Sequence, residues 1–152
     1  QFYYRSFLPS VIRDFNALPD QTKLAPTLAN FKQNVDCNPS KIPSFFYSGE
    51  RKDQILHSRL RTDCSSLASN LFDKNIVDSP LCECGEVENV HHFFLNCSKY
   101  SIQRSQLLNT ISNFCTPTLN IILSGDLSLS ININESIFAA VHKFIRDSKR
   151  FL

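Results

Sequence analysis

The chain has no methionine, only three glycines and no long hydrophobic run. Without a methionine it cannot start at its own initiation codon, so we expect it to be the end of a longer protein. No stretch approaches the roughly 18 apolar residues of a membrane span, and the first residues lack the basic-then-apolar order of a signal peptide. The sequence therefore predicts an intracellular protein, nuclear or cytoplasmic, without a membrane partner.

A large charge excess is also missing, because the net charge is only +2. So small an imbalance does not by itself indicate a nucleic-acid or membrane partner, and only local clustering of cations could do so. The hydrophobic content is 42% and includes thirteen phenylalanines, which excludes global disorder and provides for a packed core.

Helical periodicity dominates the apolar pattern. Apolar residues at three- and four-residue steps predict helices at 8–18, 26–35, on both sides of Thr62–Asp63, at 100–114 and at 132–150, and favour a short one at 121–123. Because glycine is scarce and alternating strand patterns are absent, we expect an all-α fold, a small irregular helical domain. Residues 1–48 would form a helical arm or linker, and residues 49–152 the helical domain with a zinc-knuckle-like insertion at 79–100.

Chemistry is concentrated in the stretch SPLCECGEVENVHHFFLNC, which holds three cysteines and two histidines. Four of these residues have the spacing C-x-C-x7-H-x4-C, and they are Cys82, Cys84, His92 and Cys97. Gly85 permits the chain reversal that would direct the first two sulfurs to one point. Closely spaced thiolates and an imidazole are typical ligands of a structural zinc ion, so we predict bound Zn²⁺.

Alternatives to this ligand set remain open. His91 is a rival ligand, although it points about 100° away from His92 on a helix. We expect His92 on the last turns of a short helix from about Val87 to Leu95, with Cys97 just past its end. Residues 92 and 97 would diverge by about 140° on a regular helix, so the helix has to loosen before Cys97. A disulfide framework that adds Cys37, Cys64 and Cys115, or a set of buried core thiols, would also account for the cysteines.

The motif and its neighbours resemble the C-terminal region of reverse transcriptases encoded by non-LTR retrotransposons of the jockey-like kind. The likeness is carried by FLPSVIRDFNALP, SRLRTDCSSLASNLF, CECGEVENVHHFFLNCSKYSIQR and ESIFAAVHKFIRDSKRF. The family often has Trp where Phe15 stands, and a Gly-His pair where Asp63 and Cys64 stand. The resemblance implies a zinc-binding accessory region that follows the reverse transcriptase domain of the same polyprotein and helps it hold its RNA template or DNA target.

Catalysis by this piece is not expected, because the chain has no Asp-Asp pair for two divalent ions and no phosphate loop. Nucleic acid would instead be bound by cations and one aromatic residue around the cluster: Arg51, Lys52, Arg59, Arg61, Lys99, Tyr100 and Arg104. The alternative is that these charges form a solvated helix face and that Tyr100 belongs to the core. In that case the domain would be a protein-interaction or scaffolding remnant without affinity for nucleic acid.

Overall fold

The computed structural model describes residues 23, 24, 26 and 42–151. The helix predicted at 8–18, nearly all of the one predicted at 26–35, and Cys37 lie outside the described residues. Contacts divide the chain into two units, Gln1–Pro43 and Ser44–Leu152, and nearly all of the described residues belong to the second. The predicted boundary between an arm and a domain at residue 48 stays a prediction.

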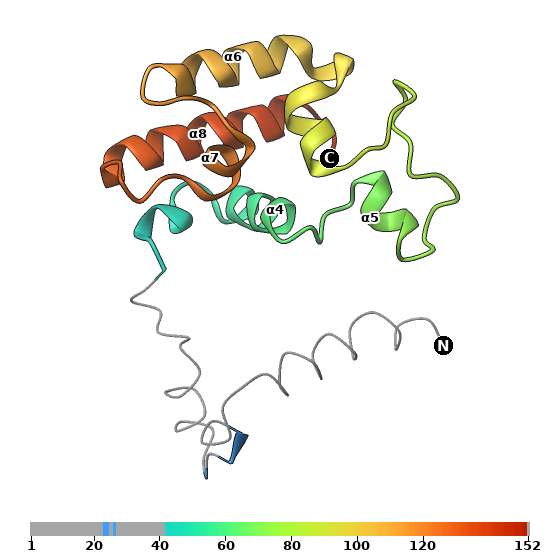
Figure 1. The fold of residues 1–152 in the computed structure, drawn as a ribbon, viewed down its shortest axis with the longest axis horizontal. Helices are drawn as coiled ribbons and strands as arrows, with labels where there is room; N and C mark the ends of the chain where they lie inside the picture. The colour runs from blue at the N-terminus through green and yellow to red at the C-terminus, as the bar shows by residue number, and fades with distance from the viewer. Residues whose placement is uncertain (1–22, 25, 27–41, 152) are drawn as a thin grey trace. The chain divides into compact units, whose positions relative to one another are not determined.

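The described unit is built from helices, as Figure 1 shows. They are η2 (Ser44–Tyr47), α4 (Arg51–Arg61), α5 (Ala68–Phe72), η3 (His92–Asn96), η4 (Ser98–Tyr100), α6 (Ser101–Ser112), α7 (Leu119–Ser124) and α8 (Ile131–Asp147). The described residues contain no strand, only an isolated bridge between Leu81 and Val87. The predicted all-α class is therefore confirmed. Among these helices none is both long and apolar enough to cross a bilayer.

Helix α8 organises the domain. Its apolar residues recur with helical spacing, and those on one side, including Ile137, Phe138, Val141 and Phe144, are buried. It contacts α4, α6, α7 and η2, and Figure 1 shows it between α6 and α4. The buried stripe of α8 thus brings together segments that are distant in the sequence.

Two groups of aromatic rings fill the core. Around Phe138, the rings of Phe45, Phe46 and His57 lie with centroids 4.6 to 5.7 Å away. Around Phe93, the rings of Phe94, Tyr100, Phe144 and Phe151 lie at 5.0 to 5.4 Å. Because Phe93 and Phe94 are completely buried, the cysteine- and histidine-rich segment is fixed to the core by its own side chains.

The ends of several helices differ from the sequence-based expectation. The segment after Thr62–Asp63 contains only the five-residue α5, because residues 63–67 form a turn with Asp63 at a φ of 54°. The favoured helix at 121–123 is confirmed as α7, whose first turn is capped by the Thr118 hydroxyl. Helix α8 starts earlier than residue 132, because the Ser130 hydroxyl accepts a hydrogen bond from Ile133 N and caps it.

Candidate metal centre

The four predicted ligands converge. The sulfurs of Cys82, Cys84 and Cys97 and a ring nitrogen of His92 all lie within 4.8 Å of one another. Cys97 Sγ is 3.7 Å from Cys82 Sγ and 3.9 Å from Cys84 Sγ, and His92 Nε2 is 3.2 Å from Cys84 Sγ. A tetrahedral ion with metal–sulfur bonds of about 2.3 Å separates its sulfurs by roughly 3.8 Å. The cluster can therefore hold a metal ion, and its donor set is compatible with zinc.

A tight turn positions the first two ligands. Gly85 N donates to Cys82 O at 2.9 Å, and Cys82 N donates to Glu86 O at 2.7 Å, next to the bridge between Leu81 and Val87. Gly85 has a φ of 92°, in the left-handed region that other residues rarely adopt. The turn doubles the chain back on itself and directs both sulfurs to the same side.

A widened helical turn positions the last two ligands. The short helix that begins at Val90 becomes a π-helix over His92–Asn96, and Cys97 N donates to His92 O at 2.8 Å. This five-residue spacing brings positions 92 and 97 back to one side, which a regular α-helix would not do. The predicted loosening before Cys97 is confirmed. The predicted start of this helix near Val87 is wrong, because Val87 is held in the bridge with Leu81.

The structure places His92, and not His91, in the cluster. His92 is buried and faces the sulfurs, whereas His91 is exposed and lies outside the cluster. His92 Nδ1 lies 3.1 Å from Glu86 Oε2, so a proton on Nδ1 is donated to that carboxylate and Nε2 is left with its lone pair toward the sulfurs. Asn89 Oδ1 supports the same turn by accepting from His92 N at 2.8 Å.

Glu86 is a site residue that the sequence reasoning missed. The available signal was an acidic residue directly after the glycine of the turn, between the first ligand pair and the histidine. Carboxylates that orient a ligating histidine typically contribute a factor of about 10 to 100 to metal affinity, so we expect a loss of that size in Glu86→Ala. Competition with a chromophoric chelator measures it. Glu83→Ala is the matched control because the Glu83 carboxylate pairs with Lys99 and not with a side chain of the cluster, and equal losses in both variants would contradict the assignment.

The protein environment treats the thiols differently. Burial raises the pKa of Cys82 to about 11, while the backbone N–H of Glu86 lowers the pKa of the exposed Cys84. Removing a thiolate from water without a counter-charge is costly, so a buried thiol stays protonated. A divalent ion that binds the sulfur stabilises the thiolate instead. The site therefore favours Cys82 as a thiolate only when a cation lies against it.

The disulfide alternative does not fit this geometry. The sulfurs are 3.7 and 3.9 Å apart, well beyond the roughly 2.05 Å of a disulfide bond. Cys64 and Cys115 are also free thiols, one exposed and the other partly buried. The described cysteines thus consist of three in the cluster and two separate thiols.

Three of the predicted nucleic-acid-binding residues share the exposed side of α4. Arg51, Lys52 and Arg59 are exposed, and Arg51 makes one long contact of 3.4 Å with Gln54. The only acidic residue of this helix, Asp53, is 3% exposed and accepts a hydrogen bond from Arg146. Within α4 itself the outer side therefore carries cations and no acidic residue, although the exposed N-cap residue Glu50 directly precedes Arg51.

The other four residues are engaged within the fold. Arg61 Nε donates to Leu123 O at 2.6 Å, and its guanidinium lies 3.9 Å from the centre of the Phe46 ring. Arg104 donates to Cys97 O at 2.8 Å and Lys99 to Glu83 at 2.6 Å. Tyr100 is 3% exposed and its ring packs on Phe93, which leaves no free ring face for a base. The core alternative for Tyr100 is the one that this burial supports.

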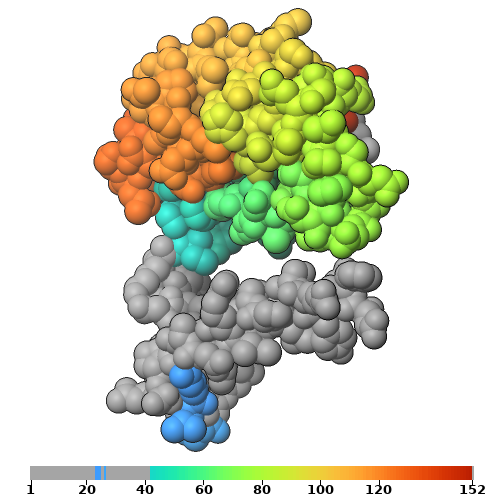
Figure 2. Space-filling model, turned by 45° about the vertical axis from the view of Figure 1, so that its right-hand side comes forward, coloured from blue at the N-terminus to red at the C-terminus, as the bar shows by residue number. Residues whose placement is uncertain are grey.

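The arrangement defines a small all-α domain with a Cys₃His cluster able to hold a metal ion. The cluster lies in the yellow-green segment that forms part of the surface in Figure 2. Comparisons of the chain with protein-family models, with curated proteins and with solved structures find no match.

Proposed function

We propose that this chain is a zinc-stabilised, non-catalytic accessory domain that binds the phosphate backbone of RNA or DNA through α4. The observation that carries the proposal is the outer side of this helix, where Arg51, Lys52 and Arg59 are exposed while Asp53 is turned inward to Arg146. Cations arranged in this way contact phosphates without reading sequence and release condensed counterions on binding.

The zinc ion would be structural. Three thiolates and one imidazole complete a tetrahedral coordination shell, and a catalytic zinc instead keeps one position for water or substrate. Sulfur-rich tetrahedral sites favour zinc over hard cations such as magnesium or calcium. The ion would fix the turn at Gly85 to the π-helix at His92. Because Phe93 and Phe94 are buried in the core, the ion would thereby also stabilise the packing of this segment against the rest of the domain.

The proposed biological setting rests on the sequence resemblance. A domain of this kind would follow the reverse transcriptase domain of a non-LTR retrotransposon polyprotein and would help that domain hold its RNA template or DNA target. The proposed partners are accordingly a nucleic acid and the upstream domain of the same chain. This setting would require a surface that binds phosphates and a stable fold, and the cationic side of α4 and the metal cluster would provide them.

Charge reversal on α4 tests the nucleic-acid part of the proposal. In Arg51→Glu/Arg59→Glu we expect affinity for a single-stranded oligonucleotide to fall at least about tenfold at 0.1 M salt, and the magnitude of the slope of log K against log salt to decrease by about 1.4, since each phosphate contact on a single strand contributes about 0.7. Fluorescence anisotropy over a salt series measures both quantities. Lys74→Glu/Lys143→Glu is the matched control, because it changes the net charge equally at exposed lysines outside α4.

Equal losses in the two double variants would show that only the net charge matters, and no binding by the parent chain would reject nucleic-acid binding. The second candidate function, a scaffolding or protein-interaction domain, is favoured by one observation. Arg61, Tyr100 and Arg104 make contacts inside the fold that a purely structural domain would also need.

A further inference from the structure

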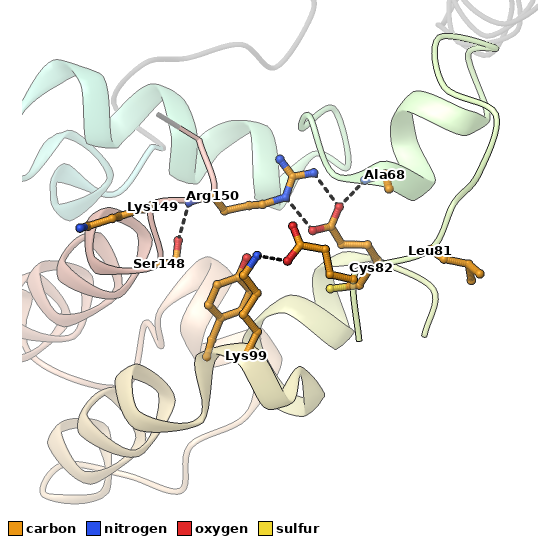
Figure 3. Close-up of a pocket in the computed structure, with 10 residues that line it drawn as sticks. Ala68, Leu81, Cys82, Lys99, Ser148, Lys149 and Arg150 are labelled. Atoms are coloured by element: carbon orange, nitrogen blue, oxygen red, sulfur yellow. Dashed lines mark hydrogen bonds and ion pairs between the residues drawn. The ribbon is translucent and has the colours of Figure 1, made fainter. Parts of the chain in front are cut away.

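A cavity of about 350 Å³ lies directly beside the metal ligand Cys82. One wall is the turn that carries Cys82 and Glu83, a second is the start of the helical segment at Lys99 and Tyr100, and a third is the chain after α8 at Ser148–Arg150. Figure 3 shows Lys99 and Arg150 on opposite sides of this cavity, while the side chain of Lys149 extends away from it.

Most polar groups of the cavity already have partners. Arg150 donates to both carboxylate oxygens of Glu88 at 2.6 Å, and Glu88 also accepts from Ala68 N at 2.7 Å. The Ser148 hydroxyl donates to Ile145 O at 2.7 Å. Because Glu88 is paired with Arg150 and both of its oxygens accept hydrogen bonds, it presents little uncompensated negative charge to a ligand.

Two donors remain available on one wall. Tyr100 is 3% exposed, yet its hydroxyl makes no hydrogen bond within the described part of the chain and is not sealed from solvent, so it opens into the cavity. The neighbouring Lys99 ammonium uses one of its three N–H groups on Glu83 at 2.6 Å. An O–H and an ammonium that line the same cavity match a ligand that offers anionic oxygens.

We infer that this cavity binds a phosphate group through the Tyr100 hydroxyl and the Lys99 ammonium. Lysine and tyrosine side chains are common donors to phosphate oxygens in nucleic-acid complexes. Glu83 is the competitor, with its side chain 81% exposed at the rim, and an exposed ion pair of this kind is weak enough for a phosphate to displace. The inference rests on the proposed function only for the source of the phosphate, which is then the nucleic-acid backbone beside the metal centre.

Substitutions of opposite sign test the site in the zinc-loaded chain. Tyr100→Phe keeps the ring packing and removes only the hydroxyl, so we expect about fivefold weaker binding of inorganic phosphate. Glu83→Gln releases Lys99 from its competitor and should strengthen phosphate binding severalfold. Amide chemical shifts near residue 99 during a phosphate titration measure both, with chloride at matched ionic strength as the reference. Tyr47→Phe is the matched control, since Tyr47 is an exposed tyrosine of η2.

The same variants are then tested with an oligothymidine that has no terminal phosphate, so that its only phosphates are those of the backbone. A loss in Tyr100→Phe for both probes supports a backbone phosphate as the ligand, and a loss for inorganic phosphate alone supports a free phosphate. No shifts near residue 99, or equal affinities in Tyr100→Phe and Tyr47→Phe for both probes, would overturn the site. If Tyr100→Phe changes neither phosphate binding nor oligonucleotide binding while Arg51→Glu/Arg59→Glu weakens oligonucleotide binding, this inference is overturned and the proposed function is left intact.

Discussion

Cys84→Ser is expected to lower the affinity for zinc at least about 100-fold, which corresponds to about 2.7 kcal/mol of lost stabilisation at a fixed zinc concentration above both dissociation constants. The physical reason is that structural metal binding is coupled to folding, because the ligands converge only in the folded chain. The side chain of Cys84 is exposed. Without a metal, the substitution would change stability by no more than about 0.5 kcal/mol, as for other surface positions.

Because Cys84 is exposed, the experiment separates the two possibilities clearly: the expected loss of stability is severalfold larger if Cys84 binds a metal than if it does not. Cys64→Ser is the matched control, because Cys64 is an exposed free thiol outside the cluster. Thermal melting with zinc and after chelation, followed by circular dichroism, compares the three chains. We expect chelation to lower the melting temperature of the parent chain to nearly that of Cys84→Ser. The difference in melting temperature between the parent and Cys64→Ser should be the same with and without zinc. Identical melting of the parent with and without zinc would refute a structural metal.

Acid is expected to destabilise the domain through a buried histidine pair. His57 is 1% exposed, and burial together with nearby Arg61 and His142 lowers its pKa from 6.5 to about 3. Its Nε2 lies 2.9 Å from Ile122 O and its Nδ1 lies 3.3 Å from His142 Nε2. If Nε2–H donates to the carbonyl, Nδ1 has to accept from His142, and a proton on Nδ1 would place two N–H groups against each other.

The sign of the pH dependence follows from the lowered pKa. The unfolded chain takes up a proton on this residue below pH 6.5, whereas the folded chain resists it down to about pH 3, so the stabilisation is complete above pH 6.5 and declines as the pH falls. At pH 5 the expected loss is about 2 kcal/mol from His57. Burial also lowers the pKa of His142. The positive charge of Arg146 lowers it further, and the negative charge of Asp53 only partly opposes this shift, so His142 adds to the loss of stability in acid.

Urea unfolding from pH 7.5 to 5.0, with bound zinc quantified at each pH, measures this effect separately from acid release of the metal. His57→Gln is the control, because the amide can still donate to Ile122 O and accept from His142 but does not titrate. We expect a smaller dependence of the unfolding free energy on pH in the variant. The same slope in both chains, at equal zinc content, would show that His57 is not the responsible group.

The candidate metal centre was predictable because its geometry is local. All four ligands lie between residues 82 and 97, where a glycine turn and one widened helical turn are enough to bring them together. Glu86 escaped prediction, since its contact with His92 depends on the orientation of one ring within that segment. Its position next to Gly85 gave no direction for the side chain.

The candidate binding residues were predicted less well, because spacing does not reveal what packs against a helix. Arg51 and Arg61 look alike in the sequence, but Arg61 faces Leu123 O and the Phe46 ring, whereas Arg51 stays exposed. Tyr100 follows Lys99 directly, and yet its ring belongs to the core formed with Phe93 and Phe144. Such differences arise from contacts between residues far apart in the chain.

By itself the sequence determined the helical class and the four residues of the candidate metal centre, since apolar periodicity and short ligand spacing act within one or two turns of chain. Only the tertiary structure decided which cations remain on the surface, that His57 meets His142 across 85 residues, and that the Tyr100 hydroxyl opens beside Cys82. The reason is that a side chain becomes buried against α8 only when the other helices pack around it. A charged or aromatic side chain acquires its role from the neighbours that this assembly brings to it.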